Sequence, residues 1–482
     1  MSISRVIKSI QNIMREDTGV DGDAQRLGQL TWMLFLKIYD DQDIQSSSLK
    51  KDYKSVLPKK YRWNSWAGDD EGITGDELID FINNDMFPAL KNFQYKRNDD
   101  PRKFIIKQVF EDTFNYIKSG TILKRVINKI NEINFNKTSD RHEFSDLYET
   151  LLRSLQSAGN AGEYYTPRPV TKFITQMINP KLKDIILDPA CGTGGFIINS
   201  LEHIRENEVN TKQDEKNLQE NIFGFEKKPL PTLLSITNLI LHGVEIPKNL
   251  IRKNPLNRPI RDYTNKDHVD IILTNPPFGG VEESSVKGNF PTSFQTTETA
   301  DLFLHLITIL LKHKGKAGIV LPDGSLTGSG VKARIRENLL KTCNVHTIVK
   351  LPNSVFKPYA TVSTNMIFLE KGSPTKEIWY YEHNVPEGLK NYSKTKPIKF
   401  EDFANLKNWW NQRKKNRFAW KVSIKEIEKR KWELDCKNPF EEKIIIKNPE
   451  DIMTNLKEID KSYIDEFNNL NIEIKKFIDE SK

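Results

Sequence analysis

Short apolar segments that alternate with longer helical patterns constrain the fold of this chain more than any other feature. From about Asp184 onward these segments read "DIILDPACG", "NIFGFE", "VDIILTNPPFG" and "KAGIVLP". Helices that connect consecutive strands place those strands parallel in one sheet and then pack on its faces. The sequence therefore predicts an α/β domain with a largely parallel sheet.

The regions on either side of these strands have different residue patterns. From Ile3 to about Phe135 the apolar residues recur at helical spacing, which predicts a helical domain. Near Glu382 the strand pattern fades into the basic and aromatic stretch "LKNWWNQRKKNRFAWKVSIKEIEKRKWEL". We therefore divide the chain into a helical N-terminal domain at 1–145, an α/β domain at 146–382, and a basic and helical C-terminal region at 383–482.

An apolar stripe runs along the C-terminal tail. Its residues fall at alternating steps of three and four, which places them on one side of a long helix. They are Ile452, Leu456, Ile459, Tyr463, Phe467, Leu470, Ile474 and Phe477. The stripe either packs on its own chain or forms a coiled-coil seam for another chain, and the pattern favours neither.

Charge and cysteine content narrow the classes of function. The net charge of +8 and the pI near 9.0 favour a polyanionic partner. The three cysteines show no paired spacing, so neither a disulfide framework nor a zinc site is indicated. The most apolar N-terminal run, "LTWMLFLKIYDD", is interrupted at Lys37, far short of the ~20 residues that a membrane span needs. We expect a cytoplasmic protein that uses no metal.

The segment "IILDPACGTGGF", Ile185 to Phe196, joins a strand to a helix through an acid and several glycines. In an open α/β sheet, ligands bind at the carboxyl ends of the strands, where glycines let the backbone approach closely. The spacing is not G-x-G-x-x-G and no Lys follows the glycines, which argues against a dinucleotide site and a P-loop. Either a different nucleoside cofactor binds here, or the turn merely needs glycine.

A second acid, Glu226, ends the next strand in "NIFGFEKKP". A carboxylate at the end of the second strand can accept hydrogen bonds from both ribose hydroxyls of a nucleoside. The order of the two motifs favours this role over that of a solvated surface residue.

The stretch "NPPF" ends a third strand and suggests chemistry at an aromatic amine. The amino group of adenine or cytosine is a poor nucleophile because its lone pair is delocalised into the ring. The side-chain oxygen of Asn275 and the carbonyl of Pro276, held by a proline-stiffened turn, can accept both N–H bonds as charge develops. Phe278 can stack on a base that has been extruded from the duplex.

In these motifs the sequence resembles the S-adenosylmethionine-dependent amino-group DNA methyltransferases of the N6-adenine branch. More narrowly, it is similar to the modification subunits of type I restriction–modification systems. The resemblance is carried by "GEYYTPRPV" (Gly162 to Val170), "DPACGTGGF", "GFE" and "NPPF", and covers nearly the whole chain. It implies a Rossmann-like methyltransferase domain flanked by a helical N-terminal domain and a helical tail for subunit contacts.

The resemblance also implies the site. Asn275, Pro276, Pro277 and Phe278 would form the target-amine site. The cofactor, S-adenosyl-L-methionine, would contact Glu163, Tyr164, Tyr165, Thr166, Pro167, Arg168, Asp188, Gly192, Thr193, Gly194, Gly195 and Glu226. The family often has an acid-containing segment before the third core strand that touches the cofactor adenine. Here that region reads "IRKNPLNRPIRDY", and Asn254 or Asp262 would serve. Cys191 is interpreted as a small packing residue, and Phe356 or Tyr359 as core aromatics that could also flank the base.

As partners, the resemblance implies double-stranded DNA and a specificity subunit that reads the target sequence and binds two modification subunits. A motor-nuclease restriction subunit can be added. From the residues alone, the rivals are a methyltransferase for RNA or for a protein glutamine, and a non-catalytic scaffold that binds nucleic acid. The intact "NPPF" argues against the scaffold.

Overall fold

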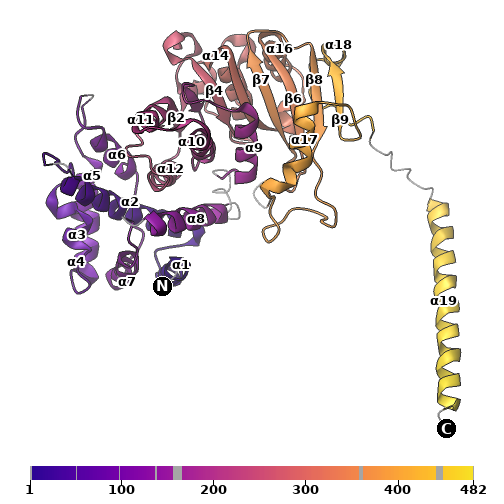
Figure 1. Ribbon diagram of the computed structural model, residues 1–482, viewed down its shortest axis with the longest axis horizontal. Coiled ribbons are helices and arrows are strands. Elements are labelled where there is room, and N and C mark those ends of the chain that lie inside the picture. Colours follow the sequence, from indigo (N-terminus) through magenta and orange to yellow (C-terminus); the bar gives the residue numbers. More distant parts are fainter. Residues whose placement is uncertain are drawn as a thin grey trace. The chain divides into compact units, whose positions relative to one another are not determined.

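The computed structural model describes residues 3–49, 51–96, 98–135, 138–155, 165–357, 362–440 and 449–480. The chain divides into two compact units, Met1–Cys436 and Lys437–Lys482. The first unit joins a helical N-terminal region to a mixed sheet with helices on both of its faces (Figure 1). None of the helices within the described ranges combines the length and the apolar character that a bilayer span requires.

The helical N-terminal region is confirmed. Its helices are α1 (Ile3–Arg15), α2 (Gly22–Leu49), α3 (Trp63–Trp66), α4 (Gly75–Asp80), α5 (Phe87–Lys91), α6 (Pro101–Phe110), α7 (Gly120–Asn131) and α8 (Thr138–Ser154), with a π-helical segment at Phe81–Met86. The start of α6 shows how the sequence sets an end: the side chain of Asp100 accepts from the N–H of Arg102, and Pro101 has no N–H that would need an acceptor.

The sheet contains nine strands in the order β3-β2-β1-β4-β5-β7-β6-β8-β9. They are β1 (Ile186–Asp188), β2 (Ile222–Glu226), β3 (Leu250–Arg252), β4 (Val269–Thr274), β5 (Leu311–Pro322), β6 (Cys343–Leu351), β7 (Thr364–Lys371), β8 (Glu377–Glu382) and β9 (Ala419–Ser423). The strands from β3 to β5 are parallel, whereas β7 is antiparallel to β5 and β6. The α/β fold and the four strands first predicted, β1, β2, β4 and β5, are confirmed.

Helices cover both faces of the sheet. One face packs against α9 (Arg168–Ile178), α10 (Gly195–Glu208), α11 (Lys212–Asn221) and α12 (Pro229–Leu241), and its core is continuous with that of the N-terminal helices. The other face packs against α14 (Thr299–Leu310), α16 (Val331–Thr342) and α18 (Ile424–Lys429). The short helices α13 (Ser284–Lys287) and α15 (Asp323–Leu326) lie in loops.

The N-terminal region also covers the edge strand β3. The side chain of Gln108, on α6, donates to the carbonyl of Leu250 at 2.9 Å and accepts from the N–H of Arg252 at 2.9 Å. An open strand edge carries unpaired backbone groups, and Gln108 satisfies one of each kind. The helical region therefore completes the sheet as well as its core.

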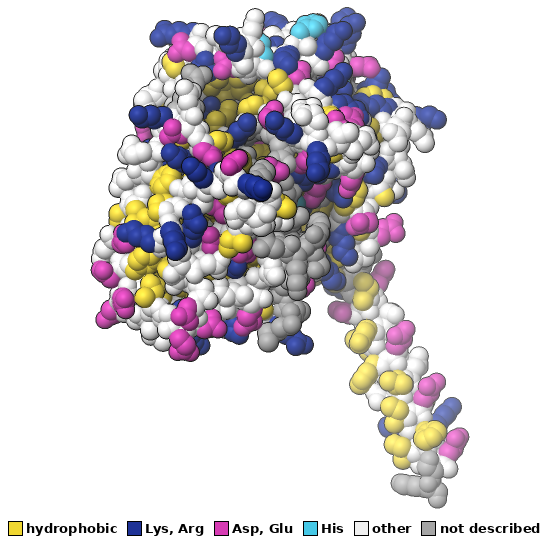
Figure 2. Space-filling view, turned by 60° about the vertical axis from the view of Figure 1, so that its left-hand side comes forward, with side chains coloured by type: hydrophobic (Ala, Val, Ile, Leu, Met, Phe, Trp, Pro, Cys, Tyr) yellow, Lys and Arg dark blue, Asp and Glu magenta, His cyan; other side chains and the backbone are white. Residues whose placement is uncertain are grey.

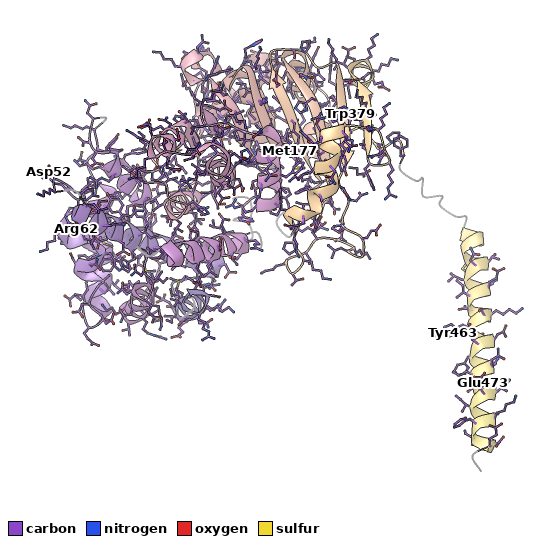
Figure 3. All side chains as sticks on the ribbon, in the orientation of Figure 1. Asp52, Arg62, Met177, Trp379, Tyr463 and Glu473 are labelled. Carbon is purple, nitrogen blue, oxygen red and sulfur yellow. The ribbon has the colours of Figure 1, made fainter. Side chains whose placement is uncertain are left out.

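The sheet extends past the boundary that the sequence suggests near residue 382. β9 pairs antiparallel with β8, and Trp379 of β8 meets Trp409 of α17 (Ala404–Gln412) with ring centroids 5.6 Å apart (Figure 3). In the basic stretch, Arg413 is half-buried, lies over the Trp410 ring and donates to Thr347 at 2.8 Å. The basic and aromatic region therefore supplies an edge strand and aromatic packing.

The second unit contains one long helix, α19 (Pro449–Glu480). Seven residues of the predicted stripe have exposed side chains here: Leu456, Ile459, Tyr463, Phe467, Leu470, Ile474 and Phe477, each between 47% and 75% exposed. Figure 2 shows apolar side chains along the helix, and Figure 3 labels Tyr463 on it. The eighth, Ile452, has a side chain outside the described set.

Candidate active site

Three of the predicted site residues stand at or directly after the ends of adjacent parallel strands. Asp188 is the last residue of β1, Glu226 the last of β2, and Asn275 follows β4. Since β1 lies between β2 and β4, the three side chains share the carboxyl edge of the sheet. This edge is where open α/β sheets bind their ligands.

The glycine-rich loop after β1 bends tightly over that edge. Gly192 and Gly194 have φ angles of 52° and 81°, a region that favours glycine. A Cβ atom on Gly194 would lie 2.7 Å from the hydroxyl oxygen of Ser235, so a larger residue would require that side chain to move. The N–H of Gly192 donates to Oε2 of Glu226 at 3.0 Å. The loop and the second acid are thus joined directly.

Burial dominates the electrostatics of the two acids. Asp188 is 2% exposed and Glu226 is 8% exposed. Burial, with the charge of Glu226 adding to it, raises the pKa of Asp188 from 3.8 to about 7, although hydrogen bonds from Thr274 and Ala190 oppose the rise. Oε1 of Glu226 accepts from the N–H of Lys228 at 2.8 Å. A cation or a hydroxyl donor bound at this edge would therefore meet buried acceptors.

The amide of Asn275 is held at one end only. Its Nδ2 donates to the hydroxyl oxygen of Thr166 at 2.9 Å. Its Oδ1 is buried and finds no hydrogen-bond partner among the residues that the structure describes. Leaving a buried acceptor unsatisfied costs about 1–3 kcal/mol, so this oxygen is suited to accept a hydrogen bond from a bound group.

Phe278 of the "NPPF" tetrad contacts a second aromatic ring. Phe278 is half-buried, and its ring centroid lies 5.5 Å from that of Phe356 in an edge-to-face arrangement at 71°. Phe356 is 3% exposed, so it packs in the core and also reaches the predicted base-stacking residue. Pro276 is buried and Pro277 is half-buried. Tyr359 lies outside the described residues.

The segment before α9 brings Thr166 to Asn275. Pro167 precedes the helix, and Arg168 is its first residue. The guanidinium of Arg168 lies over the ring of Tyr165, forms an ion pair with Glu149 at 2.6 Å and donates to the hydroxyl of Thr193 at 3.1 Å. Arg168 is therefore already paired inside the protein. Glu163 and Tyr164 lie outside the described residues.

A cavity of about 630 Å³ adjoins this segment. Its lining includes Tyr165, Pro167 and Arg168 together with Lys357 and Phe400. The lining does not extend to the acids at the strand ends, so the cavity borders the site on the side of α8 and α9.

Sequence reasoning missed Glu282, a buried acid in the loop after β4. Its carboxylate accepts from Lys227 at 2.9 Å and from the side chain of Asn254 at 3.0 Å. Asn254 is thereby placed beside the ends of β2 and β3, whereas the side chain of Asp262 is 53% exposed. Contact with the cofactor adenine stays a prediction, and this geometry favours Asn254 over Asp262. No local pattern marks Glu282, because its neighbours come from distant loops.

Comparison with known proteins places this chain in a family. The model of the N-6 DNA Methylase family matches residues 139–447, and that of the HsdM N-terminal domain matches residues 3–130. The chain belongs to the N-6 DNA methylase family. The family assignment expected from the motifs is thus confirmed, and the chain has the activity class of an adenine-specific DNA methyltransferase.

Individual relatives of this methylase are type I proteins. The chain is 53% identical over 460 residues to the type I restriction enzyme EcoEI methylase subunit of Escherichia coli, with 94% of each chain covered. It is 43% identical to a modification subunit of a type I restriction enzyme from Vibrio vulnificus, with a TM-score of 0.79, covering 91% of this chain and 97% of that one. A structure concerned with complex assembly and conformational transition of the type I R-M system is 34% identical, with a TM-score of 0.82, covering 98% and 97%.

Proposed function

We propose that this methylase transfers the methyl group of S-adenosyl-L-methionine to the N6 amino group of adenine in a specific DNA sequence, as the modification subunit of a type I restriction–modification complex. The observation that carries the proposal is the buried Oδ1 of Asn275, which has no hydrogen-bond partner among the described residues. Thr166 occupies the donor end of that amide, so the acceptor end is left for the target amine. An exocyclic amine is a donor that fits it.

The residues at the strand ends fit the cofactor by their chemistry. When bound, S-adenosyl-L-methionine supplies a methyl group on a cationic sulfonium. Glu226, at the end of β2 and joined to the loop through the N–H of Gly192, is an acid placed to accept from the ribose hydroxyls. The backbone of Gly192, Thr193, Gly194 and Gly195 gives close approach, and Asp188 offers a buried carboxylate to the cationic end. Tyr165 and Thr166 would line the same site.

The amine site works by positioning and polarisation. Asn275 Oδ1 and the carbonyl of Pro276 would accept both amine hydrogens and favour a pyramidal nitrogen as positive charge develops. Phe278, backed by Phe356, would stack on the extruded adenine. The transfer is a direct in-line displacement without a covalent enzyme intermediate. No side chain of the "NPPF" tetrad is a base at neutral pH, so the proton leaves to solvent after the transfer.

The complex supplies target recognition. The relative described in terms of type I complex assembly supports a multi-subunit assembly for this chain, and we propose a specificity subunit as its partner. Double-stranded DNA, two modification subunits for each specificity subunit, and an added restriction subunit complete the proposed cytoplasmic assembly. The exposed stripe on α19 is the surface that we assign to the specificity subunit.

A methyl-acceptor assay tests this function. The purified chain is mixed with radiolabelled S-adenosyl-L-methionine and with DNA, RNA or a glutamine-containing protein, with and without the specificity subunit. We expect label in DNA adenine when the specificity subunit is present, little without it, and none with Asn275→Ala. Labelling of RNA or protein instead would contradict the proposal, and robust site-specific DNA methylation by the chain alone would contradict the role of a partner.

A further inference from the structure

Glu149 stands at the centre of a half-buried cluster that the proposed chemistry does not use. It lies on α8, which precedes the segment that carries Thr166. Its carboxylate accepts from Nε of Arg168 at 2.6 Å and from the second terminal nitrogen of Arg168 at 3.1 Å. It also accepts from the side-chain amide of Asn238, on α12, at 2.8 Å. One carboxylate therefore fixes donors from two different helices.

Both of these donors also reach the glycine-rich loop at one residue. Arg168 donates to the hydroxyl of Thr193 at 3.1 Å, and Asn238 donates to the carbonyl of Thr193 at 3.1 Å. Thr193 is 1% exposed. The guanidinium also lies over the start of α10, because a Cβ atom on Gly195 would be 1.9 Å from it. The position of the loop thus depends on two side chains that Glu149 orients.

The charges in this cluster are balanced within the protein. The side chains of Glu149 and Arg168 are each 19% exposed. Burial acts to raise the pKa of Glu149, but the Arg168 guanidinium and the Asn238 amide outweigh it and hold that pKa below its usual value. The pKa of Arg168 is correspondingly raised, although burial opposes the rise. The pair is therefore ionised, and Glu149 neutralises the charge of Arg168.

The same helix is anchored in the N-terminal region. The hydroxyl of Tyr148, adjacent to Glu149, donates to the carbonyl of Leu234 at 3.2 Å and lies 3.4 Å from the hydroxyl of Thr31, on α2. Tyr148 is fully buried. α8 consequently joins the helical region, α12 and the loop of the cofactor site.

We propose that Glu149 is a positioning residue for cofactor binding. It touches no reacting atom, but it holds Arg168 and Asn238 where they fix Thr193 and with it the loop that binds S-adenosyl-L-methionine. Arg168 then serves as part of this frame, with its charge already neutralised, and not as a counter-ion for the cofactor carboxylate. The inference rests on the proposed function, since it takes S-adenosyl-L-methionine to bind at this loop.

The chain offers a matched control for removing this charge. Glu215 accepts from Nε of Arg205 at 3.0 Å, from the second terminal nitrogen of Arg205 at 2.5 Å, and from the side-chain amide of Gln219 at 2.6 Å. This arrangement repeats the arginine and amide donors of Glu149, but it lies between α10 and α11 and contacts no residue of the glycine-rich loop.

The test compares Glu149→Gln with Glu215→Gln. A glutamine amide turns an N–H group toward one of the former donors, so both variants lose a charge-assisted interaction. Calorimetric titration of the full chain with S-adenosyl-L-methionine should show a Kd raised by about tenfold in Glu149→Gln, and a Kd within about twofold of wild type in Glu215→Gln. In the complex with the specificity subunit, the KM for S-adenosyl-L-methionine should rise with the Kd while kcat at saturation holds.

Equal Kd values in the two variants would overturn the inference. If Glu149→Gln fails to fold, Asn238→Ala removes the amide that links Glu149 to the carbonyl of Thr193, and an unchanged Kd in that variant would also overturn it. A wild-type chain that binds no S-adenosyl-L-methionine would contradict the proposed function itself, which is a separate outcome.

Discussion

At the scale of single residues, the amide of Asn275 is oriented for its substrate because only its nitrogen has a hydrogen-bond partner among the described residues. An amide carries donors at one end and an acceptor at the other. Thr166 takes the donor end, and the acceptor end is buried without a partner among the described residues. The hydrogen bond to Thr166 therefore orients the amide so that the target amine meets its oxygen, an acceptor, and not its NH₂ group, a donor that would repel it.

The hydroxyl of Thr166 can be removed without changing the shape of the side chain. We expect Thr166→Val to lower the single-turnover methylation rate of the complex by about 10- to 100-fold, because the amide of Asn275 is then free to rotate. Thr166→Ser restores the hydroxyl and should recover most of the rate. A wild-type rate in Thr166→Val would contradict this role.

Asp188 predicts a pH dependence for cofactor binding. Its pKa of about 7 means that it is largely protonated below that pH when no cation is bound. A cationic ligand favours the ionised form, so the affinity for S-adenosyl-L-methionine should fall as the pH drops below 7, by at most about tenfold per pH unit. Titrations between pH 5.5 and pH 8.5 measure this. Asp188→Asn should bind weakly with a flat profile, and a parallel slope in that variant would contradict the assignment.

The same carboxyl has an opposite effect on stability. Its pKa is raised from 3.8 in the unfolded chain to about 7 in the folded one. Above pH 7 the folded protein therefore carries a buried charge that burial disfavours, and this cost disappears as the pH falls toward 4. Without cofactor, Asp188→Asn should have a higher Tm than wild type at pH 8, and the difference should shrink between pH 7 and pH 4.

At the scale of elements, α19 exposes an apolar stripe along much of its length. Phe467 and Leu470 lie in the middle of the stripe and are 60% and 54% exposed. Large apolar surfaces of this kind mark interfaces with other chains. We assign the stripe to the specificity subunit as part of the proposed function.

A charge within the stripe should disrupt that interface. Phe467→Asp is expected to weaken association with the specificity subunit by at least about tenfold, as measured by size-exclusion chromatography with light scattering. Asn468→Asp adds the same charge to the neighbouring residue outside the stripe and should associate normally. Destabilisation of the isolated chain by Phe467→Asp with association intact would favour packing of the stripe on its own chain.

Some elements could be predicted from the sequence because their signal is local. β1, β2 and β4 each combine an apolar run with an acid or a turn, so the sequence showed both the strands and the residues at their ends. β9 was not predicted, since it has five residues, including Lys421 and Ser423, and is defined by its pairing with β8. Glu149, Asn238 and Glu282 carry no local signal, because their partners come together only when distant helices and loops pack.

At the scale of the whole molecule, the helical N-terminal region and the sheet depend on each other. Gln108 satisfies the open edge at β3, and Tyr148 links α2 to α12. Both contacts join residues far apart in the sequence, so they form only in the assembled unit. A substitution that removes one of these contacts should therefore also loosen the packing around the glycine-rich loop.

Two buried histidines predict how the folded unit responds to acid. Burial lowers the pKa of His305 and of His383 from 6.5 to about 4, and for His383 the charge of Asp402 opposes the shift. Their contribution to stability is complete above pH 6.5 and is lost as the pH falls through 4. The ring of His305 contacts those of Phe290 and Phe294. His305→Phe should therefore remove up to about 3 kcal/mol of the stability that the wild-type protein loses in acid. Its Tm curve should fall less steeply than wild type from pH 6.5 to pH 4 and run parallel above pH 7; equal slopes would contradict the prediction.

The central claim is that this chain methylates adenine in DNA through Asn275. The most direct test is to map N6-methyladenine at single-base resolution in the genome of the host, with the wild-type gene, with the gene deleted and with Asn275→Ala. The account predicts that methylation at a split, two-part site is present with the wild-type gene and lost in the other two strains. Methylation that is unchanged by deletion or by Asn275→Ala, in a host that expresses the protein, would contradict it.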